Sequence, residues 1–337
     1  MNINFTRNLA LLVAILFANY LVAQDPIFSQ YYSAPMQINP AFAGNTYAPH
    51  IAINYRNQWP SLDKAYITFG AAYDQLIENL NSGIGIMLLS DNAGNGIYKT
   101  SNFSAVYAYR LEVNDDFFLK FGLRGGAIQS TLNWDKLIFY DQLDPINGTT
   151  DPNGAPIPTE EQRPNELTRT YFDVGTGFLA YTKNFYGGIS LNHLNRPDEG
   201  FFNTNENLES GLPLRLAIQA GGQIQLREAN RKNDSPAYVS PNITYIRQNN
   251  FNQIHANIIA SAGLVFGGVG FRHTFGNSDA AIFIAGMQKG VFKLGYSYDL
   301  TVSGLAGKTG GAHEVSLILN FEKERKADYN DCFHLFR

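Results

Sequence analysis

The chain has 337 residues, of which only 16% are charged while 13% are aromatic. A mean hydropathy of −0.19 excludes a bundle of transmembrane helices. The formal net charge is −4 and no long block of like charge occurs, so nothing indicates binding to nucleic acid. The length fits either two soluble domains or one large barrel.

Residues 1–23 have the pattern of a secretory signal peptide. Arg7 supplies the positive n-region, residues 9–22 form an apolar run, and Ala23 suits a cleavage site. The run is short for a membrane span, and the alternative is a buried N-terminal helix. We therefore expect an exported chain that begins near Gln24.

The segment 24–49 is interrupted by prolines at positions 26, 35 and 40, so it cannot be a central strand. Its aromatic side chains would not stay unburied in water. We expect the segment to fold into or against the periplasmic mouth of a barrel, as a plug or docking surface. The alternative is an ordered cap on the first strand. The residues expected to form the plug or partner surface are Phe28, Tyr31, Tyr32, Asn39, Pro40, Phe42 and Gly44.

From residue 50 onward, segments that alternate apolar and polar residues follow one another almost without interruption. Side chains of a strand point alternately to its two faces, so this period of two predicts strands. We expect them at 50–56, 65–74, 82–90, 101–110, 117–129, 170–181, 184–193, 213–226, 237–247, 252–265, 267–275, 279–288, 291–299 and 312–321. No convincing run of helical periodicity twelve residues long follows Ala23.

The stretch FFLKFGLRGGA at 117–127 illustrates the two faces, because its apolar residues share one parity and its cationic residues the other. A soluble sheet would bury the apolar face in a core, whereas a membrane barrel would turn it to lipid and turn the polar face into a wet lumen. In a barrel, the expected lumen-facing residues are Lys120, Arg124, Arg215, Gln219, Gln223, Lys293 and Asp299. The expected lipid-facing residues are Phe117, Leu119, Phe121, Leu123, Leu216, Ile218, Phe292 and Leu294.

The segment 251–271 is the place where a helix competes with strands, because it contains no Asp, Glu, Lys or Arg. Polar residues dilute its first half and four glycines interrupt its second half. Two strands joined by a tight turn at FGG, residues 266–268, fit this composition better.

The predicted connections alternate in length. Short ones occur at EVNDD, YTKN, FGG and QKG, while long ones cover 131–169, 194–212 and 300–311. Outer-membrane barrels have short periplasmic turns and longer outer loops, whereas a soluble β-sandwich has no reason to sort its loops in this way. We therefore predict an all-β fold, a transmembrane outer-membrane β-barrel of about fourteen antiparallel strands over residues 50–321, with both chain ends in the periplasm. A soluble β-rich domain is the alternative.

The sequence lacks the usual motifs of catalysis and metal binding. GLAGKTGG at 304–311 is preceded by Val302 at the position where a phosphate-binding loop needs glycine, and HE at 313–314 lacks the second histidine of a zinc-protease motif. Three acids, Asp141, Asp144 and Asp151, lie in one predicted loop, where calcium binding competes with simple solvation, but the EF-hand spacing is absent. We predict no enzymatic activity, no cofactor and no metal.

The tail 322–337 follows Phe321, which ends the last predicted strand, and it is polar and charged at first. We expect a periplasmic extension that contacts partner proteins, with a solvated tail as the alternative. Cys332 is the lone cysteine, so an intramolecular disulfide is excluded, as is ordinary for a bacterial envelope protein.

Six blocks of sequence carry a family resemblance. They are QDPIFSQYYSAPMQINPAFAG at 24–44, YRNQW at 55–59, GIGIMLLSDNAG at 83–94, FDVGTGFLAYTKNFYGGISLNHLNRP at 172–197, GVGFRH at 268–273 and LGYSYDLTVSGLAGKTGGAHEVSLILNF at 294–321. As an ordered set they resemble the PorP/SprF family, outer-membrane proteins of the type IX secretion and gliding machinery of Bacteroidetes. The chain departs from the family at its end, where DCFHLFR replaces a Cys-Pro-Arg-Phe-like tail.

The resemblance implies an integral outer-membrane barrel, without catalytic residues, that is needed for secretion of type IX cargo or for display of surface adhesins. It also implies partners besides outer-membrane lipid, namely periplasmic ring subunits and a peptidoglycan-binding lipoprotein. An outer-membrane channel or transporter for small or hydrophobic molecules is the main alternative, although polar residues on the expected inner faces argue against an apolar lumen. A third possibility, an outer-membrane hydrolase, lacks a nucleophile–base pair.

Overall fold

The computed structural model describes residues 25–62, 65–201, 211–227, 236–275, 277–304, 307–321 and 331–337. The signal peptide expected at 1–23 therefore lies outside the described residues. Within these ranges, no helix has both the length and the apolar character needed to span a bilayer.

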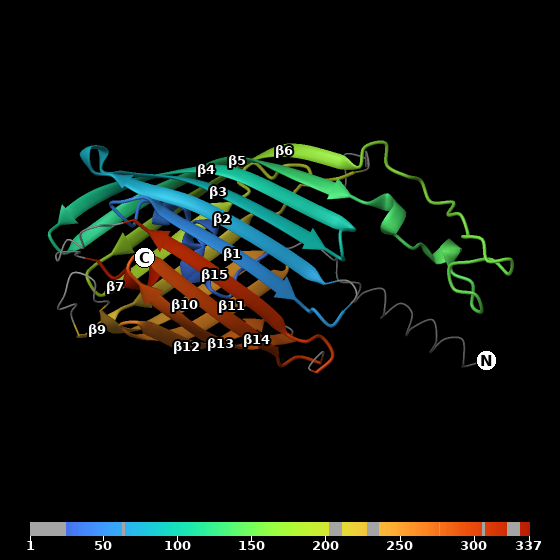
Figure 1. The fold of residues 1–337 in the computed structure, drawn as a ribbon. Coiled ribbons are helices and arrows are strands. Elements are labelled where there is room, and N and C mark those ends of the chain that lie inside the picture. The colour runs from blue at the N-terminus through green and yellow to red at the C-terminus, as the bar shows by residue number, and fades with distance from the viewer. Residues whose placement is uncertain are drawn as a thin grey trace, which may run out of the picture.

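The described strands form one closed antiparallel barrel (Figure 1). They are β1 (His50–Gln58), β2 (Tyr66–Ile77), β3 (Ser82–Ala93), β4 (Tyr98–Asn114), β5 (Phe117–Leu132), β6 (Thr168–Tyr181), β7 (Phe185–Asn192), β8 (Arg215–Gly222), β9 (Ile224–Arg227), β10 (Ala237–Gln248), β11 (Phe251–Ala262), β12 (Val265–Thr274), β13 (Asn277–Lys289), β14 (Phe292–Thr301) and β15 (Ala312–Asn320). β1 pairs with β15, which closes the sheet. β8 and β9 pair with successive parts of β10, so they form one interrupted strand and the barrel has fourteen.

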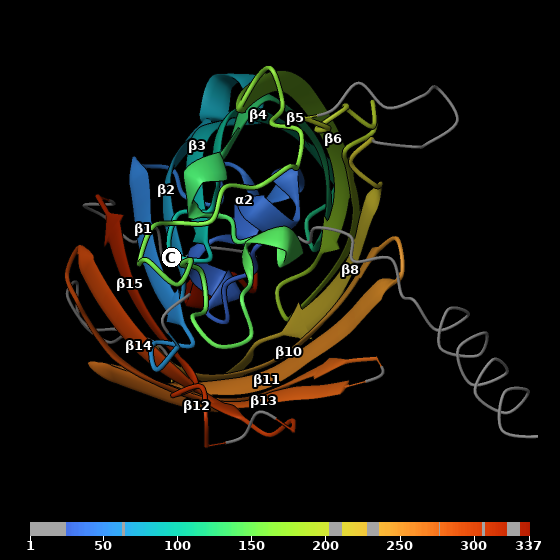
Figure 2. The same ribbon diagram turned by 90° about the vertical axis from the view of Figure 1, so that its right-hand side faces the viewer.

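The short helices lie mainly at the chain ends and in one long loop. They are η1 (Tyr31–Ser33), α2 (Pro35–Ile38), η2 (Pro40–Phe42), η3 (Glu78–Leu80), η4 (Trp134–Lys136), η5 (Tyr140–Gln142) and η6 (His334–Phe336). Figure 2 looks into the barrel and shows α2 inside the ring of strands.

The strand predictions agree with this fold to within a few residues at each strand end, with two corrections. The turn expected at FGG is wrong, because Phe266 belongs to β12 and the chain reverses at Gly263, which has a φ of +89°. The strand expected at 213–226 is interrupted at Gln223, after which all four residues of β9 are exposed. Pro241 lies opposite this interruption on β10 and has no N–H to donate to it.

The two ends of the barrel differ in the length of their connections. One end, called the short-turn end below, carries the connections 78–81, 115–116, 182–184, 263–264 and 290–291, and the longer 228–236. The other, called the long-loop end, carries the three longest connections, 133–167, 193–214 and 302–311, together with the shorter 59–65, 94–97, 249–250 and 275–276. Figure 1 shows the 133–167 loop, in green, reaching well beyond the strands.

The outer surface of the barrel is apolar. Of the residues expected to face lipid, Leu123 is 60% exposed and Phe292 is 59% exposed, and Phe121, Ile218 and Leu294 are also exposed. Phe117, Leu119 and Leu216 are half-buried. Alternation places the neighbours of Leu123, Gly122 and Arg124, on the buried inner face. A continuous apolar outer face is what a barrel in a lipid bilayer requires.

Leu123→Arg places a charge on this outer face, in the middle of β5. We expect the barrel to lose about 2–4 kcal/mol of folding free energy, because a cation near the bilayer midplane is poorly solvated. Urea titration of refolded barrels in lipid vesicles measures this cost. Gln129→Arg, also outward but near the end of β5, is the matched control and should cost about 0–1 kcal/mol. Equal costs at the two positions would contradict the lipid-facing assignment.

Candidate functional site

The N-terminal residues 25–49, called the plug below, run through the lumen from one end of the barrel to the other. The Asp25 amide donates to Gln248 Oε1 at 3.2 Å, at the long-loop end. The Gly44 amide donates to Asp74 Oδ2 at 2.8 Å, at the short-turn end. The sequence led us to expect a plug at one mouth only, but the structure extends it along the whole lumen.

The plug is enclosed by the barrel wall. Residues 28–44 are buried, with the exception of half-buried Ala34. Pro35 occupies the first position of α2 and Pro40 the first position of η2, where a missing N–H costs no helical hydrogen bond. Asn39 caps η2, since its Oδ1 accepts from the Ala41 amide at 2.9 Å. The prolines that exclude a strand here thus fit a compact chain of single turns.

The plug approaches the wall closely where the wall carries glycine. A Cβ at Gly122 would lie 2.2 Å from the Ala41 amide nitrogen, and one at Gly177 would lie 2.0 Å from Asn39 Oδ1. The same Asn39 side chain donates to the carbonyl of Phe178 at 3.0 Å. These inward glycines of β5 and β6 therefore let the plug reach the backbone of the wall.

Gly122→Ala should displace the plug around Ala41, because the added methyl has no space. We expect a loss of about 1–3 kcal/mol, as for overpacked cores, and faster proteolysis within residues 34–46. Limited proteolysis of refolded protein detects this change. Gly125→Ala is the matched control on the same strand, since its Cβ meets only Phe172 at 3.5 Å. Equal proteolysis of both variants would show that the contact at Gly122 does not hold the plug.

A cluster of buried charges, called the Ser29 cluster, fixes the middle of the plug to the wall. Glu314 accepts the amides of Ser29 and Gln30, each at 2.8 Å. Arg56 donates to Asp299 Oδ2 at 2.8 Å and to Glu314 Oε2 at 3.1 Å. The remaining cation, Arg272, contacts Asp299 at 3.0 Å and Ser29 Oγ at 2.9 Å, and donates to Asp279 at 2.5 Å. Each charge is paired, as burial demands.

A second chain of charges holds the start of the plug. His193 lies between two carboxylates, with Nδ1 2.8 Å from Asp173 and Nε2 2.9 Å from Asp25. Arg124 donates to Asp173 at 2.7 Å, and Arg215 donates to Asp25 at 3.3 Å. We call these five residues the Asp25 chain.

The C-terminal residues 331–337 also enter the lumen, at the short-turn end. Phe336 stacks on Phe42 of the plug with ring centroids 5.1 Å apart, and Phe333 packs 4.9 Å from Tyr181 of β6. Cys332 is buried, and burial raises the pKa of its thiol above its ordinary value. We expected a tail that extends away from the barrel, but its last seven residues return into it. Residues 322–330 lie outside the described part of the chain.

The residues expected to face the lumen are all buried. Lys120 donates to the Ala43 carbonyl at 2.7 Å, and Lys293 bonds the Leu335 carbonyl of the tail. Gln223 Oε1 accepts from the His334 amide at 3.2 Å. Asp299 belongs to the Ser29 cluster, Arg124 and Arg215 belong to the Asp25 chain, and the Gln219 amide has no hydrogen-bond partner among the described residues.

The residues expected in the plug are likewise buried within the barrel. Tyr31 donates to Asn257 Oδ1 at 3.2 Å, and Tyr32 donates to Gln30 at 2.8 Å. Phe28 is 2% exposed. Its ring packs so closely on Gly70 of β2 that a Cβ added to this glycine would lie 3.0 Å from the ring. The other members are Asn39, Pro40, Phe42 and Gly44, whose contacts are given above; Gly44 has a φ of +70°.

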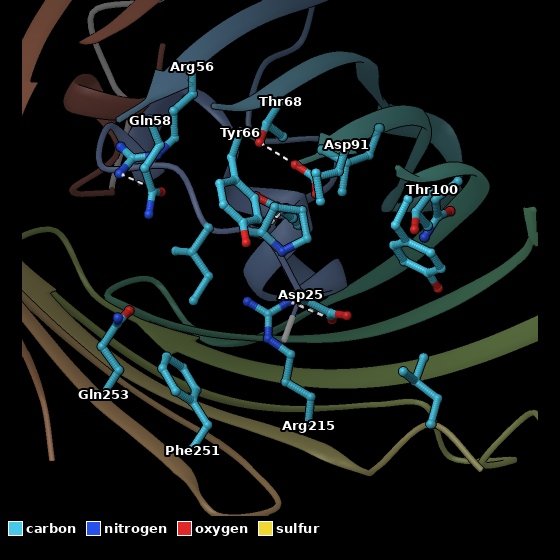
Figure 3. A pocket seen from close by; sticks show the side chains of 18 of the residues that line it. Asp25, Arg56, Gln58, Tyr66, Thr68, Asp91, Thr100, Arg215, Phe251 and Gln253 are labelled. Atoms are coloured by element: carbon cyan, nitrogen blue, oxygen red, sulfur yellow. Dashed lines mark hydrogen bonds and ion pairs between the residues drawn. The ribbon is translucent and has the colours of Figure 1, made fainter. Parts of the chain in front are cut away.

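A cavity of about 620 Å³, called the vestibule below, lies above the plug toward the long-loop end (Figure 3). Its floor includes Asp25 and Ile27 of the plug, and four arginines line it: Arg56, Arg124, Arg215 and Arg272. Aromatic side chains, among them Trp59, Tyr66 and Phe251, line it as well. Among the described residues, no group of three or more His, Cys, Asp and Glu side chains could hold a metal ion.

Sequence analysis missed most of the residues that hold the plug. Arg56, Asp173, Arg272 and Glu314 lie within blocks that carry the family resemblance, on strands whose parity places them inward. A signal was therefore present, because a charge on the inner face of a barrel strand needs a partner. The partner on the plug could not be found, since Glu314 and Ser29 are separated by 285 residues.

The fold and the apolar outer face define an integral membrane β-barrel whose lumen contains both described ends of its chain. Residues 21–319 match the family described as type IX secretion system membrane protein PorP/SprF, and the chain belongs to this family. No curated protein matches the chain.

Several solved barrels are similar to the chain. The toluene transporter TbuX of Ralstonia pickettii matches with 10% identity and a TM-score of 0.49, over 85% of this chain and 92% of that chain. The toluene transporter TodX of Pseudomonas putida matches with 9% identity and a TM-score of 0.48, over 89% and 98%. A Rhodopseudomonas blastica porin mutant matches with 6% identity and a TM-score of 0.33, over 81% and 99%.

Proposed function

We propose that the protein is a non-enzymatic outer-membrane component of type IX secretion that supports secretion or surface display of cargo proteins as a docking barrel and not as an open pore. The observation that carries this proposal is the plug, which crosses the lumen and is fixed by two sets of buried charges. An open pore for diffusing solutes needs a free lumen, whereas a docking protein needs stable surfaces at its two ends.

The proposal assigns the two ends of the barrel to the two sides of the membrane. Short turns face the periplasm and long loops face the outside in outer-membrane barrels. The short-turn end, where the tail and Gly44 lie, would then face the periplasmic ring subunits and the peptidoglycan-binding lipoprotein. The vestibule and the 133–167 loop would face adhesin-type cargo at the cell surface.

The channel alternative finds no support in the lumen. The plug buries Phe28, Tyr31 and Phe42 against the wall, and the wall side chains around it include Lys120, Arg56 and Glu314. A path for hydrophobic compounds would need a free apolar route, and the charged wall of the vestibule floor does not supply one.

A pull-down from native outer membranes tests the proposal. An epitope in the 133–167 loop leaves the strands, plug and tail intact, and mild detergent with mass spectrometry identifies what is retained. Recovery of ring, lipoprotein or adhesin components, together with a secretion defect in the deletion strain, is the expected result. A barrel that is recovered alone, with secretion intact in the deletion strain, would overturn the proposal in favour of a transporter.

A further inference from the structure

Two guanidinium groups in the vestibule have donors that are not used. Arg215 is 2% exposed; its Nη1 donates to Asp25, but its Nε and Nη2 have no hydrogen-bond partner among the described residues. Arg124 donates from Nη2 to Asp173, and its Nε also has no partner there. Buried polar groups are normally satisfied, so such a group of donors indicates a missing acceptor.

The excess of donors is local. Arg56 and Arg272 line the same cavity, and all of their buried nitrogens have acceptors within the Ser29 cluster or beside it. The two clusters therefore differ. In the Ser29 cluster every buried arginine nitrogen has an acceptor, whereas in the Asp25 chain some arginine nitrogens have none among the described residues.

Gln248 adds a third donor next to Arg215. The two residues are direct neighbours in the register of β8 and β10. Gln248 Oε1 accepts the Asp25 amide, while Nε2 has no partner in the described structure. Asp25 thus contacts both side chains, and three donor nitrogens, two on Arg215 and one on Gln248, have no acceptor among the described residues.

The free edge of Arg215 has the geometry that a carboxylate recognises. Nε and Nη2 lie on the same edge of the planar guanidinium and present two parallel N–H bonds, which match the two oxygens of a carboxylate. Figure 3 shows one edge of the Arg215 guanidinium toward Asp25 and the opposite edge on the side of Phe251 and Gln253.

The charges of the Asp25 chain favour an anion. Burial acts to lower the pKa of His193, but the carboxylates of Asp25 and Asp173 raise it to about 9. At neutral pH the chain then has three positive groups, His193 and the two arginines, against two carboxylates. The five residues of the Asp25 chain thus carry one excess positive charge, while Asp91 and Glu199 also line the vestibule.

We propose that the vestibule binds a carboxylate ligand, held by Nε and Nη2 of Arg215, which lines the cavity, and by Nε2 of the adjoining Gln248. Neighbouring atoms cover these three nitrogens, so binding requires the side chains around them to move apart. The remainder of the ligand lies in the cavity lined by Trp59, Tyr66 and Phe251, which suits an apolar or ring-containing group. The C-terminus of a peptide and an acidic sugar both supply this chemistry. The site does not depend on the role in secretion, and each proposal can fail without the other.

Calorimetry on the full-length protein in detergent micelles tests the site with two pairs of probes. The first pair is N-acetyl-Ala-Ala-Phe as the free acid and as the amide; the second is trigalacturonic acid and its neutral galactose counterpart. We expect one acid to bind at least about tenfold more tightly than its neutral analogue, since a charge-assisted bidentate contact is lost. Binding of the peptide acid identifies a chain terminus as the ligand, and binding of the sugar acid identifies an acidic glycan. Absence of binding, or equal binding of acid and neutral forms, overturns the proposal.

Two variants separate the site from the packing around it. Arg215→Lys keeps the charge but removes the planar edge, and it should weaken acid binding about tenfold or more. Gln248→Glu places a carboxylate beside Arg215, so the variant should fold at least as stably as wild type and lose acid binding. Arg169→Lys, outside the cavity on β6, is the control and should change nothing. Wild-type affinity in Gln248→Glu would contradict the site even if Arg215→Lys failed to fold.

Discussion

Deletion of residues 25–44 is expected to convert a barrel with little or no conductance into an open pore. The plug crosses the lumen, nearly all of its residues 28–44 are buried, and the wall that it leaves behind carries charged residues such as Lys120, Arg56 and Glu314. A polar lumen without its plug fills with water and conducts ions, as in porins. Planar-bilayer recording of the refolded variant measures the effect.

Two further variants make this result interpretable. The tail packs on Phe42, so deletion of both 25–44 and 331–337 should conduct at least as well as the first deletion. Deletion of 142–158, within the long loop and away from the plug, is the control and should not conduct. A folded 25–44 deletion that stays closed would show that something other than the plug blocks the lumen.

Arg56→Ala is expected to destabilise the protein by about 3–5 kcal/mol, the cost of removing one partner from a buried ion cluster. Arg56 is 3% exposed and bridges Asp299 and Glu314. Without it, buried Glu314 loses its arginine partner and Asp299 keeps only Arg272. The same change removes a donor to Ser29 Oγ, so the plug loses part of its attachment. Urea unfolding in lipid vesicles measures the loss.

Arg169→Ala is the matched control for this measurement. Its ion pairs with Glu166 and Asp198 are partly exposed at the long-loop end, and we expect at most about 1 kcal/mol. If the two variants lost similar stability, the Ser29 cluster would not be what holds the plug in place.

The strands could be predicted because alternation is a local property. In β5, Phe121 and Leu123 face outward while Lys120 and Arg124 face inward, and four residues suffice to show it. The prolines and aromatic residues before residue 50 likewise excluded a strand and required burial. The one wrong turn prediction also concerned a local feature. The turn before β12 is at Gly263 and not at FGG, because a single glycine at positive φ is enough to reverse the chain.

The arrangement inside the lumen could not be predicted, because it depends on contacts across the whole chain. Nothing near Ser29 in the sequence points to Glu314, and nothing in DCFHLFR shows that Phe336 returns to stack on Phe42. The direction of the plug was equally hidden. It follows from Asp25 reaching Gln248 at the long-loop end, a contact between residues 223 positions apart.

The central claim is that the protein acts in secretion with its plug in place, and a reversible crosslink tests this most directly. Ser33 of the plug and Asn54 of β1 are in hydrogen-bond contact, so Ser33→Cys with Asn54→Cys, in a Cys332→Ser background, can join plug and wall by a disulfide. We expect cells that carry this variant to secrete cargo equally well when the disulfide is formed and when it is reduced. Secretion that stops on oxidation and returns on reduction would contradict the claim, because the plug would then have to leave the lumen for the protein to work.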